Sequence, residues 1–409
     1  MSKTKQIGLI GAHLAHSYSP EIHQALADYD YRLIELTEAE LSPFLRGKDF
    51  DGLNVTIPYK EAVIPFLDAL SPIAARLGAV NTIVKDANGN LTGHNTDYEG
   101  LMALLQQNGI AFNGKKVLIL GSGGAAKAAL AVASDMGGLP VMISRRGENN
   151  YQNLAKHADA AVIINATPVG MYPNNGEAPL SLAVFEGLEA VVDLIYNPLR
   201  TTLLQEAESR GIKAVNGLYM LVAQAAAACA LFTGKAPDKT TVQGITDKIT
   251  ASAENIILIG MPGCGKTTLG KRLAKELDRT FVDADEELIK EAGMAIPDIF
   301  QSEGEAGFRA RESRVLQRLG KARGLVLATG GGAVTRSENY APLHQNGRIL
   351  FLDTPPEGLS TEGRPLSAAK TPQALYEARL PLYRAFADIT VPITRNVEEN
   401  LTLIKEALL

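Results

Sequence analysis

Short apolar runs and amphipathic stretches alternate along the first hundred residues. The apolar runs lie at Gln6 to Ile10, Tyr31 to Leu36, Leu53 to Ile57 and Val80 to Val84, and helical patterns such as Pro20 to Ala27 separate them. Runs of this length with polar surroundings are typical of strands that alternate with helices. The pattern therefore predicts an α/β layer at the start of the chain.

A second series of the same kind follows Asp97. Residues 98–107 have a helical pattern that ends at an Asn-Gly pair. Buried strands are predicted at residues 115–120, 139–143, 161–165, 190–194 and 212–215. Strands that alternate with helical segments indicate a doubly wound parallel sheet. The alanine-rich stretch 218–232 contains Gln224 and is too short for a membrane span, so we expect a packed helix that returns to the first layer.

The third region begins after a polar stretch. Residues 235–254 contain a proline and many polar residues, and they predict either a linker or a capping helix with a linker. Residues 256–259 then read as a buried parallel strand and 269–277 as an amphipathic helix. We predict four parts: a first domain at 1–97, completed by the helix 216–234, a second at 98–215, the segment 235–252, and a third domain at 253–409.

Composition narrows the possible functions. The chain has 409 residues, a formal net charge of −5 and two cysteines. An acidic balance without a basic patch argues against nucleic acid and anionic membranes as partners, and no obligatory protein partner is evident. Two cysteines cannot form a disulfide framework, and no charged-then-apolar signal opens the chain. These features predict a cytoplasmic location and small-molecule ligands.

The strand at 256–259 runs into Gly260-Met-Pro-Gly-Cys-Gly-Lys266-Thr267, which fits the phosphate-loop pattern G-x-x-x-x-G-K-[ST]. In this motif backbone N–H groups converge on phosphate oxygens at a helix N-terminus. Lys266 is expected to reach the β- and γ-phosphates, and the Thr267 hydroxyl is expected to ligate Mg²⁺. The other loop residues expected at the nucleotide are Gly263, Cys264, Gly265 and Thr268.

The strand at 115–120 runs into a second glycine turn, which has the form G-x-G-x-x-A of dinucleotide-binding folds. The expected contacts with the pyrophosphate lie at Gly121, Gly123, Gly124 and Ala125. The next strand ends in Ser144, Arg145 and Arg146, where a fold that prefers NAD usually has an acidic residue. The two arginines favour a 2′-phosphate and hence NADP; the alternative is a solvated basic pair.

Seven motifs in the first half together resemble shikimate dehydrogenase over roughly residues 5 to 248. They are HSYSP at 16–20, NVTIPYK at 54–60, GAVNT at 78–82, GHNTD at 93–97, NATPVGM at 165–171, DLIYNP at 193–198 and NGLYMLVAQA at 216–225. The resemblance implies reduction of 3-dehydroshikimate to shikimate by NADPH. It also implies cofactor contacts from Asn165, Thr167 and Gly217. Where the family often has Asn-Arg-Thr, this chain has Ser144-Arg145-Arg146.

The same resemblance implies roles for residues of the substrate domain. Lys60 matches the catalytic lysine, and Asp97 matches the partner that orients it. A ketone reduced by hydride needs a proton, which a lysine near the carbonyl can donate. Asp97 taken alone would be the N-cap of the following helix. The residues matched to substrate binding are Ser17 and Ser19 for the carboxylate, Thr56, Asn81 and Gln224 for ring hydroxyls, and Tyr196 near the nicotinamide.

The motifs after residue 255 resemble shikimate kinase. They are FVDAD at 281–285, GEAGFRARE at 304–312, LATGGGAV at 327–334, EGRPLS at 362–367 and RLPLYRAFAD at 379–388. The resemblance implies Asp283 on the magnesium side and Asp285 at the substrate hydroxyls. It also implies Arg309, Arg379, Gly331 and Gly332 at the substrate, with Glu312 holding Arg309, and Arg364 as the lid arginine. The lid stretch is several residues shorter than expected.

These patterns predict an α/β protein. We expect an N-terminal α/β substrate domain and a Rossmann NADP-binding domain, followed by a P-loop domain of the nucleoside-monophosphate-kinase kind. The expected function is reduction of 3-dehydroshikimate by NADPH and then phosphorylation of shikimate by MgATP. One alternative is a metabolite sensor that keeps both pockets without turnover. Another is a dehydrogenase half that accepts quinate as well.

Overall fold

The computed structural model describes residues 5–14, 17–358 and 371–408. Its contacts divide the chain into two compact units. Unit 1 comprises Met1–Gly170, Glu177–Tyr196 and Leu203–Ile249, and unit 2 comprises Met171–Gly176, Asn197–Thr202 and Thr250–Leu409. Each unit has its own sheets and cores.

The first sheet of unit 1 has the strand order β2-β1-β3-β5-β6-β4. β1 pairs in parallel with β2 and β3, whereas β5 is antiparallel to both β3 and β6. The elements are β1 (Gln6–Gly11), α1 (Ser19–Leu26), β2 (Asp30–Glu35), α2 (Glu38–Gly47), β3 (Gly52–Val55), η1 (Ile64–Phe66), β4 (Ala69–Leu70), α3 (Pro72–Leu77), β5 (Thr82–Lys85) and β6 (Leu91–His94). The predicted α/β layer is confirmed, with α2, β4 and β6 as additions.

The second sheet of unit 1 is parallel throughout, in the order β11-β10-β9-β7-β8. Its elements are α4 (Thr96–Gln107), β7 (Lys116–Leu120), α5 (Gly124–Asp135), β8 (Leu139–Ile143), η2 (Leu154–His157), β9 (Val162–Asn165), η3 (Leu182–Val184), β10 (Ala190–Asp193), α6 (Thr202–Ser209) and β11 (Lys213–Asn216). All residues of β7 after Lys116 are buried, as expected for a central strand with helices on both faces. The doubly wound sheet is confirmed.

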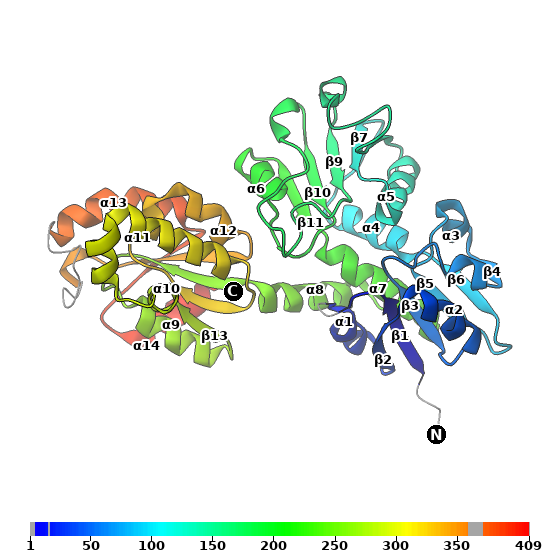
Figure 1. Cartoon of the computed structure of the whole chain (residues 1–409), viewed down its shortest axis with the longest axis horizontal. Helices are drawn as coiled ribbons and strands as arrows, with labels where there is room; N and C mark the ends of the chain where they lie inside the picture. Colours follow the sequence, from blue (N-terminus) through cyan, green and yellow to red (C-terminus); the bar gives the residue numbers. More distant parts are fainter. Residues whose placement is uncertain (1–4, 15–16, 359–370, 409) are drawn as a thin grey trace. The chain divides into compact units, whose positions relative to one another are not determined.

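Helices α4 and α7 (Leu218–Thr233) lie between the two sheets of unit 1 (Figure 1). They pack so closely that a Cβ on Gly100 would come within 2.8 Å of the Met220 carbonyl oxygen. On α7, Ala228, Cys229 and Phe232 join the core under β1. This confirms that the alanine-rich helix returns to the first layer. The polar segment that follows contains a helix, α8 (Lys239–Ala253).

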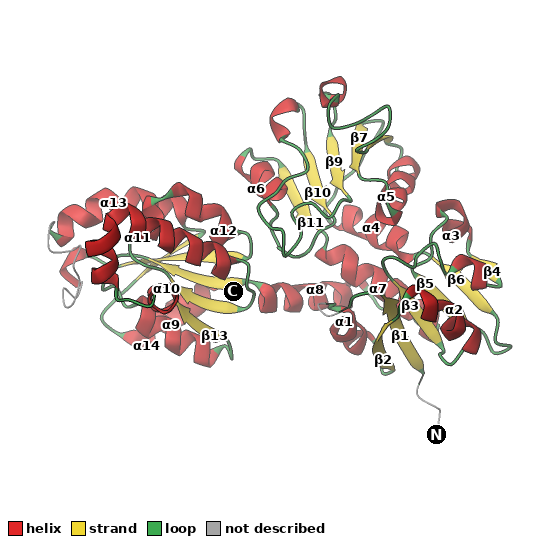
Figure 2. Cartoon of the chain, viewed as in Figure 1, coloured by secondary structure: helices red, strands yellow, loops and turns green. Residues whose placement is uncertain are grey.

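Unit 2 is built on one parallel sheet in the order β13-β14-β12-β15-β16, with helices on both faces (Figure 2). One core contains residues from α10, α11, α12 and α13, and the other contains residues from α9 and α14. The elements are β12 (Asn255–Ile259), α9 (Lys266–Glu276), β13 (Thr280–Asp283), α10 (Ala284–Ala292), α11 (Ile296–Gly320), β14 (Leu325–Ala328), η4 (Ala333–Thr335), η5 (Ser337–Asn339), α12 (Tyr340–His344), β15 (Gly347–Asp353), η6 (Pro356–Gly358), α13 (Pro372–Phe386), β16 (Ile389–Pro392) and α14 (Val397–Leu408).

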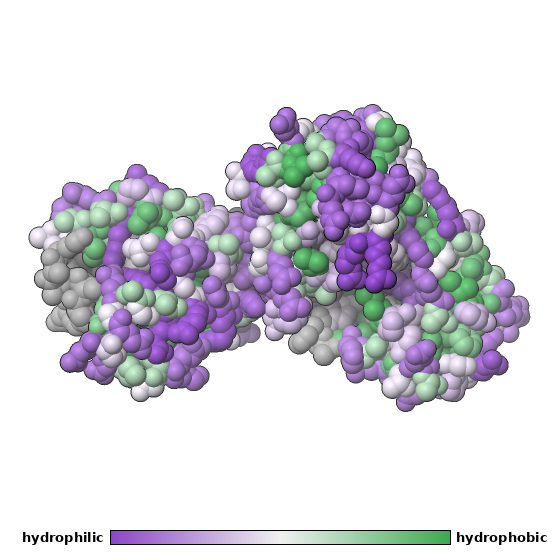
Figure 3. Space-filling view, turned by 45° about the horizontal axis from the view of Figure 1, so that its top comes forward, coloured by the Kyte–Doolittle hydropathy of each residue, from purple (hydrophilic) through white to green (hydrophobic). Residues whose placement is uncertain are grey.

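The surface carries many hydrophilic residues. On the face shown in Figure 3 they are spread over both units, and hydrophobic residues are scattered among them. None of the described helices combines the length and the apolar character that crossing a membrane requires.

Candidate active sites

A buried ion pair lies at the centre of unit 1. Lys60 follows β3 in the turn that contains Thr56, and Asp97 lies in the first turn of α4. The Lys60 Nζ is 2.6 Å from the Asp97 Oδ2, and the two side chains are 21% and 11% exposed. Asp97 does not have the N-cap role that it would ordinarily have if taken alone, because Asn95 is the N-cap and accepts the Asp97 backbone N–H. The Asp97 carboxylate is therefore left to Lys60 and Asn81.

The Asn81 amide joins this pair to α7. Its Nδ2 donates to Asp97 Oδ1 and to Thr96 Oγ1, both at 3.0 Å, and reaches Gln224 Oε1 at 3.5 Å. Thr96 also donates to Gln224 Oε1 at 3.3 Å. Thus three of the predicted site residues, Asn81, Asp97 and Gln224, form one network around Lys60. Sequence reasoning missed Thr96, which stands beside Asp97 in the GHNTD motif.

The two predicted serines stand at the start of α1. The Ser17 hydroxyl donates to Ser19 Oγ at 3.0 Å. The ring of Tyr18, between them, lies 5.9 Å from the Tyr196 ring, so this motif contacts the loop after β10. Thr56 directly follows β3, and its backbone N–H donates to the Ile10 carbonyl at the end of β1. These residues therefore collect at the carboxyl ends of neighbouring strands, where α/β folds bind ligands.

The glycine turn between β7 and α5 has the geometry of a pyrophosphate site. Gly121 has φ +111°, which glycine adopts readily, and a Cβ there would lie 3.1 Å from the Ala166 carbonyl oxygen. Gly123 is the N-cap of α5, whose first residues are Gly124 and Ala125. β7 has β8 on one side and β9 on the other, so the turn lies at the switch point of the sheet.

This turn adjoins the ion pair. A Cβ on Gly124 would lie 3.7 Å from Lys60 Cδ. After β9, the Thr167 N–H and hydroxyl both donate to Asn165 Oδ1. A Cβ on Gly217 would lie 2.1 Å from the Leu194 carbonyl oxygen, so only glycine fits there. The glycine turn and Lys60 therefore lie close enough to contact a nucleotide and a second ligand that react with each other.

Ser144, Arg145 and Arg146 directly follow β8. The Ser144 hydroxyl donates to the Arg146 carbonyl oxygen, which shapes the turn. Both arginines are exposed, and within the described residues neither guanidinium has an ion-pair partner. Two unpaired cations at the end of this strand can bind a phosphate bidentately.

In unit 2 the phosphate loop connects β12 to α9. Gly260, Gly263 and Gly265 all have positive φ. The Lys266 ammonium donates to the carbonyl oxygens of Gly260 and Met261 at 2.9 and 3.0 Å, and Cys264 is buried. The lysine thus curls back over the loop, in the position where phosphate oxygens are bound by this motif.

A cavity of about 560 Å³ opens beside this loop. Within its walls the Arg309 Nη1 donates to Glu312 Oε2 at 2.7 Å, and the Arg379 Nη1 donates to the Gly331 carbonyl at 3.1 Å. The lining residues are Pro262, Gly263, Gly265, Lys266, Thr267, Thr268, Asp283, Asp285, Ile296, Pro297, Phe300, Phe308, Arg309, Glu312, Thr329, Gly330, Gly331, Gly332, Leu375 and Arg379. All described kinase-side residues that the sequence predicted, except Cys264, therefore face one cavity; Arg364 lies outside the described residues.

The glycine run 330–332 fits between these charged side chains. A Cβ on Gly332 would lie 2.2 Å from Arg309 Nη2, and one on Gly330 would lie 2.5 Å from Glu312 Oε1. Real Cβ atoms do not come so close to other heavy atoms, so a larger residue at either position would displace the Arg309 or Glu312 side chain. The run thus leaves room for the Arg309 and Glu312 side chains just after β14.

Burial and neighbouring charges raise the pKa values of two carboxyl groups that line this cavity. Burial, with Asp283 and Glu312 nearby, raises the pKa of Asp285 to about 6. Burial also raises the pKa of Glu312. Among the described residues no partner reaches Arg309 Nε or Glu312 Oε1, although both atoms are buried. Buried polar atoms without partners usually await a ligand or water.

A second cavity, of about 390 Å³, lies on the other side of the phosphate loop. Its walls include Thr354 and Pro355 after β15, and Ile393, Thr394 and Arg395 after β16. Sequence reasoning missed these residues. The usable signal was their position, since they follow β15, which pairs with β12, and β16, which pairs with β15, at the same edge of the sheet. They are suited to hold the base of a nucleotide whose phosphates lie in the loop.

Comparison with known proteins agrees with these sites. The family model described as the shikimate dehydrogenase substrate binding domain matches residues 9–83, and the shikimate 5′-dehydrogenase C-terminal domain matches 217–243. The NADP(+) shikimate dehydrogenase of Syntrophomonas wolfei is 38% identical over 272 residues, which cover 58% of this chain and 91% of that protein. The chain belongs to the shikimate dehydrogenase family. The shikimate kinase model matches residues 262–408, so the dehydrogenase is joined to a shikimate kinase domain.

Solved structures of the dehydrogenase family resemble the first part of the chain. The Thermus thermophilus shikimate 5-dehydrogenase, in complex with NADP(H) and shikimate, is 32% identical with a TM-score of 0.56, covering 60% of this chain and 99% of that one. A chorismate mutase/shikimate 5-dehydrogenase fusion from Clostridium acetobutylicum is 37% identical with a TM-score of 0.58, covering 60% and 97%. The predicted α/β fold, the fusion of dehydrogenase and kinase, and the use of NADP and ATP are confirmed. This dehydrogenase and kinase fusion is a bifunctional enzyme of the shikimate pathway.

Proposed function

We propose that Lys60 and Asp97 carry the reduction of 3-dehydroshikimate. The observation that supports this is the 2.6 Å ion pair beside the nucleotide turn. NADPH, when bound, supplies the hydride that adds to the carbonyl carbon. The Lys60 ammonium donates a proton to the carbonyl oxygen, which becomes the new hydroxyl. Asp97 orients the ammonium through their ion pair, and bulk water reprotonates the lysine.

The remaining polar residues would bind and orient the ring. In this proposal Ser17 and Ser19 bind the substrate carboxylate, while Thr56, Asn81 and Gln224 accept or donate hydrogen bonds to ring hydroxyls. Tyr196 closes the site near the nicotinamide, next to Tyr18. Gly121, Gly123, Gly124 and Ala125 hold the pyrophosphate, with Asn165, Thr167 and Gly217 lining the cofactor path. Such fixed contacts supply much of the rate by orientation.

Arg145→Gln is expected to raise the KM for NADPH by about 10- to 100-fold, because a charge-assisted hydrogen bond to the 2′-phosphate is worth about 1.5–3 kcal/mol. The KM for NADH, which lacks that phosphate, should change less than about twofold. Steady-state kinetics with both cofactors measures this. Lys156→Gln, which removes another exposed cation of the same domain, serves as the control. Equal losses with both cofactors would contradict the role of Arg145.

For the second reaction we propose that Asp285 accepts the proton of the shikimate 3-hydroxyl as that oxygen attacks the γ-phosphorus of ATP. Arg309, held by Glu312, and Arg379 would bind the substrate carboxylate beside Gly331 and Gly332. Lys266 stabilises charge on the transferred phosphoryl group, with the backbone of Gly263, Cys264, Gly265 and Thr268 around the phosphates. The predicted lid role of Arg364 stays a prediction.

The residues present fit one Mg²⁺. The Thr267 hydroxyl donates to Asp283 Oδ2 at 2.8 Å, which places the two predicted ligands together beside the phosphate loop. In the described part of the chain no cluster of three or more His, Cys, Asp or Glu side chains could hold a metal. One hydroxyl and one carboxylate suit an ion that keeps water and phosphate oxygens as its other ligands. Mg²⁺, when bound, neutralises charge on those phosphates.

The kinase kcat/KM for shikimate should fall as the pH drops below about 6. The pKa of Asp285 is raised to about 6 from an ordinary 3.8, so the carboxylate is ionised and able to accept a proton only above that value. Below it the rate should fall about tenfold per pH unit. The profile is measured at pH 5 to 8, and each sample is returned to pH 7.5 to show that the loss is reversible. A flat profile down to pH 5 would contradict the assignment.

The two activities together are tested by incubating the full chain with 3-dehydroshikimate, NADPH and MgATP. Mass spectrometry should show shikimate and then shikimate 3-phosphate. Shikimate without phosphate would mean that unit 2 binds without transfer, and no product at all would support a sensor. The two free cysteines, Cys229 and Cys264, are buried, which suits the cytoplasmic location that we also propose.

A further inference from the structure

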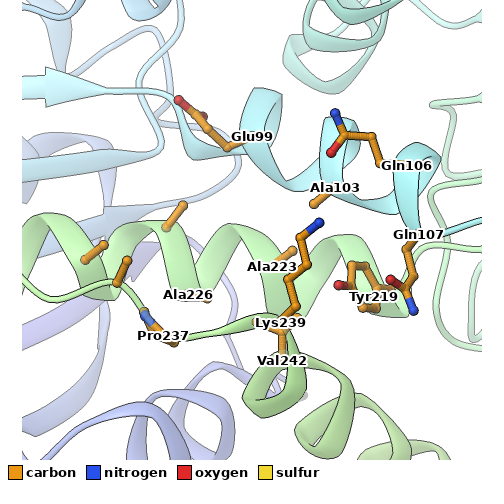
Figure 4. A pocket seen from close by; sticks show the side chains of 13 residues that line it. Glu99, Ala103, Gln106, Gln107, Tyr219, Ala223, Ala226, Pro237, Lys239 and Val242 are labelled. Atoms are coloured by element: carbon orange, nitrogen blue, oxygen red, sulfur yellow. The ribbon is translucent and has the colours of Figure 1, made fainter.

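Unit 1 has a cavity that none of the proposed reaction-centre residues lines. It has a volume of about 240 Å³ and is formed by α4, α7 and the start of α8 (Figure 4). Its floor is apolar, with five alanines of two crossing helices, Pro237 and Val242. Its walls are Glu99, Ala103, Gln106, Gln107, Tyr219, Ala223, Ala226, Ala227, Ala230, Ala236, Pro237, Lys239 and Val242, and none of the proposed active-site residues is among them. We call it the alanine cavity.

Tyr219 brings a hydroxyl to the wall of this cavity. The residue is only 8% exposed, and burial raises its pKa. Among the described residues no hydrogen-bond partner contacts the hydroxyl, and the side chain lines the cavity together with Ala223 and Lys239 (Figure 4). Because no described side chain or carbonyl occupies this hydroxyl, it is free to hydrogen-bond a ligand or water inside the cavity.

Two opposite charges also border the alanine cavity. Glu99 lies on α4 and Lys239 at the start of α8, and neither has an ion-pair partner within the described residues. In Figure 4 the Lys239 side chain extends over the cavity toward Ala103, which is one helical turn after Glu99. Partial desolvation and the charge of Asp97 raise the pKa of Glu99. A cation bound beside this carboxylate would favour its ionised form.

We propose that the alanine cavity binds an α-amino acid with an apolar side chain. The ligand ammonium pairs with Glu99, its carboxylate pairs with Lys239 and accepts from the Tyr219 hydroxyl, and its side chain covers the alanines. The volume is below the range of about 300–1,000 Å³ for drug-sized ligands, which favours a molecule of this size. A molecule with one charge leaves Glu99 or Lys239 without a partner.

The position of the cavity also gives the ligand a means to regulate the dehydrogenase. α4 carries Asp97 and α7 carries Gln224, and the two helices touch at Gly100 without space for a Cβ. A ligand that contacts α4, α7 and α8 favours the packing in which Asn81 reaches Gln224 and Asp97. The KM for 3-dehydroshikimate should therefore fall, by about fivefold if the coupling is at the lower end of the usual range.

The test uses the full chain and L-phenylalanine, whose ring can cover most of the alanine floor. Calorimetry should show saturable binding, and 2-phenylethylamine and 3-phenylpropionate, which each lack one charge, should bind at least about tenfold more weakly. L-Leucine should bind more weakly than L-phenylalanine but more tightly than either one-charge analogue. Equal binding of the one-charge analogues would overturn the proposal. So would the absence of L-phenylalanine binding up to its limit of solubility.

Three variants locate the binding. Lys239→Met removes an exposed charge, and Ala230→Leu fills the cavity from a half-buried position; both should abolish the heat and the change in KM. Lys248→Met, an exposed lysine on the same helix outside the cavity, should leave both unchanged. Binding that survives both cavity variants would overturn the site. If both cavity variants lose binding but L-phenylalanine does not change the KM of the unmodified chain for 3-dehydroshikimate, the regulatory role is overturned.

Discussion

Lys60→Met is expected to lower the dehydrogenase kcat by about 10²- to 10⁴-fold, the usual contribution of a positioned general acid. Methionine keeps the length of the side chain but has no proton to donate. It also leaves Asp97, which is 11% exposed, without its cation. Because the kinase site shares no residue with this pair, the kinase kcat of the same chain should stay unchanged.

The measurement is the rate of NADPH oxidation with saturating 3-dehydroshikimate, alongside the kinase rate with added shikimate. Lys115→Met is the matched control, since Lys115 forms an exposed ion pair with Glu189 and approaches no reactant. A Lys60→Met chain with dehydrogenase activity within tenfold of the parent would contradict proton donation by Lys60. Loss of both activities would indicate misfolding, and circular dichroism of the variant separates that case.

Asp285→Asn is expected to lower the kinase kcat by about 10²- to 10³-fold, because the amide keeps the shape of the side chain but cannot accept a proton. The variant also removes the dependence on the raised pKa, so the small remaining rate should not fall as the pH drops through 6. The loss of rate and the flat profile together distinguish a base from a residue that only positions the substrate.

The assay is ADP release with saturating shikimate and MgATP at pH 5 to 8. Asp278→Asn is the control, because Asp278 is exposed and has a positive φ that asparagine tolerates. If Asp285→Asn keeps most of the activity, or keeps the pH dependence of the parent, another group must accept the proton. The dehydrogenase rate of the variant reports on the integrity of the rest of the chain.

The parts of both sites that follow from local backbone geometry could be predicted from the sequence. The turn at Gly121 and the phosphate loop at Gly260 depend on glycines at fixed spacing between a strand and a helix, and both are confirmed as turns of that kind. The ion pair of Lys60 and Asp97 joins residues 37 positions apart, so its geometry followed only from family resemblance.

The details that sequence reasoning missed depend on contacts between distant segments. Asp97 taken alone had the position of an N-cap, but Asn95 has the extended φ and ψ of an N-cap and the Asp97 side chain pairs with Lys60. Competition between two acceptors two residues apart has no sequence signal. Likewise, Thr354 and Arg395 line one cavity only because β15 and β16 are adjacent in the sheet.

The carboxylates of the kinase cavity also have a thermodynamic consequence for the protein without substrate. The raised pKa of Asp285 means that the folded chain binds this proton more tightly than the unfolded chain does. As the pH rises from about 4 to about 6, the unfolded chain ionises first, so stability decreases and does not recover above 6. A shift from 3.8 to about 6 corresponds to roughly 3 kcal/mol. At neutral pH the ionised Asp285 carboxylate, which is the reactive form of the base, therefore lowers the folding stability of the enzyme. A cation that binds at Asp283 in the folded chain would restore part of that stability.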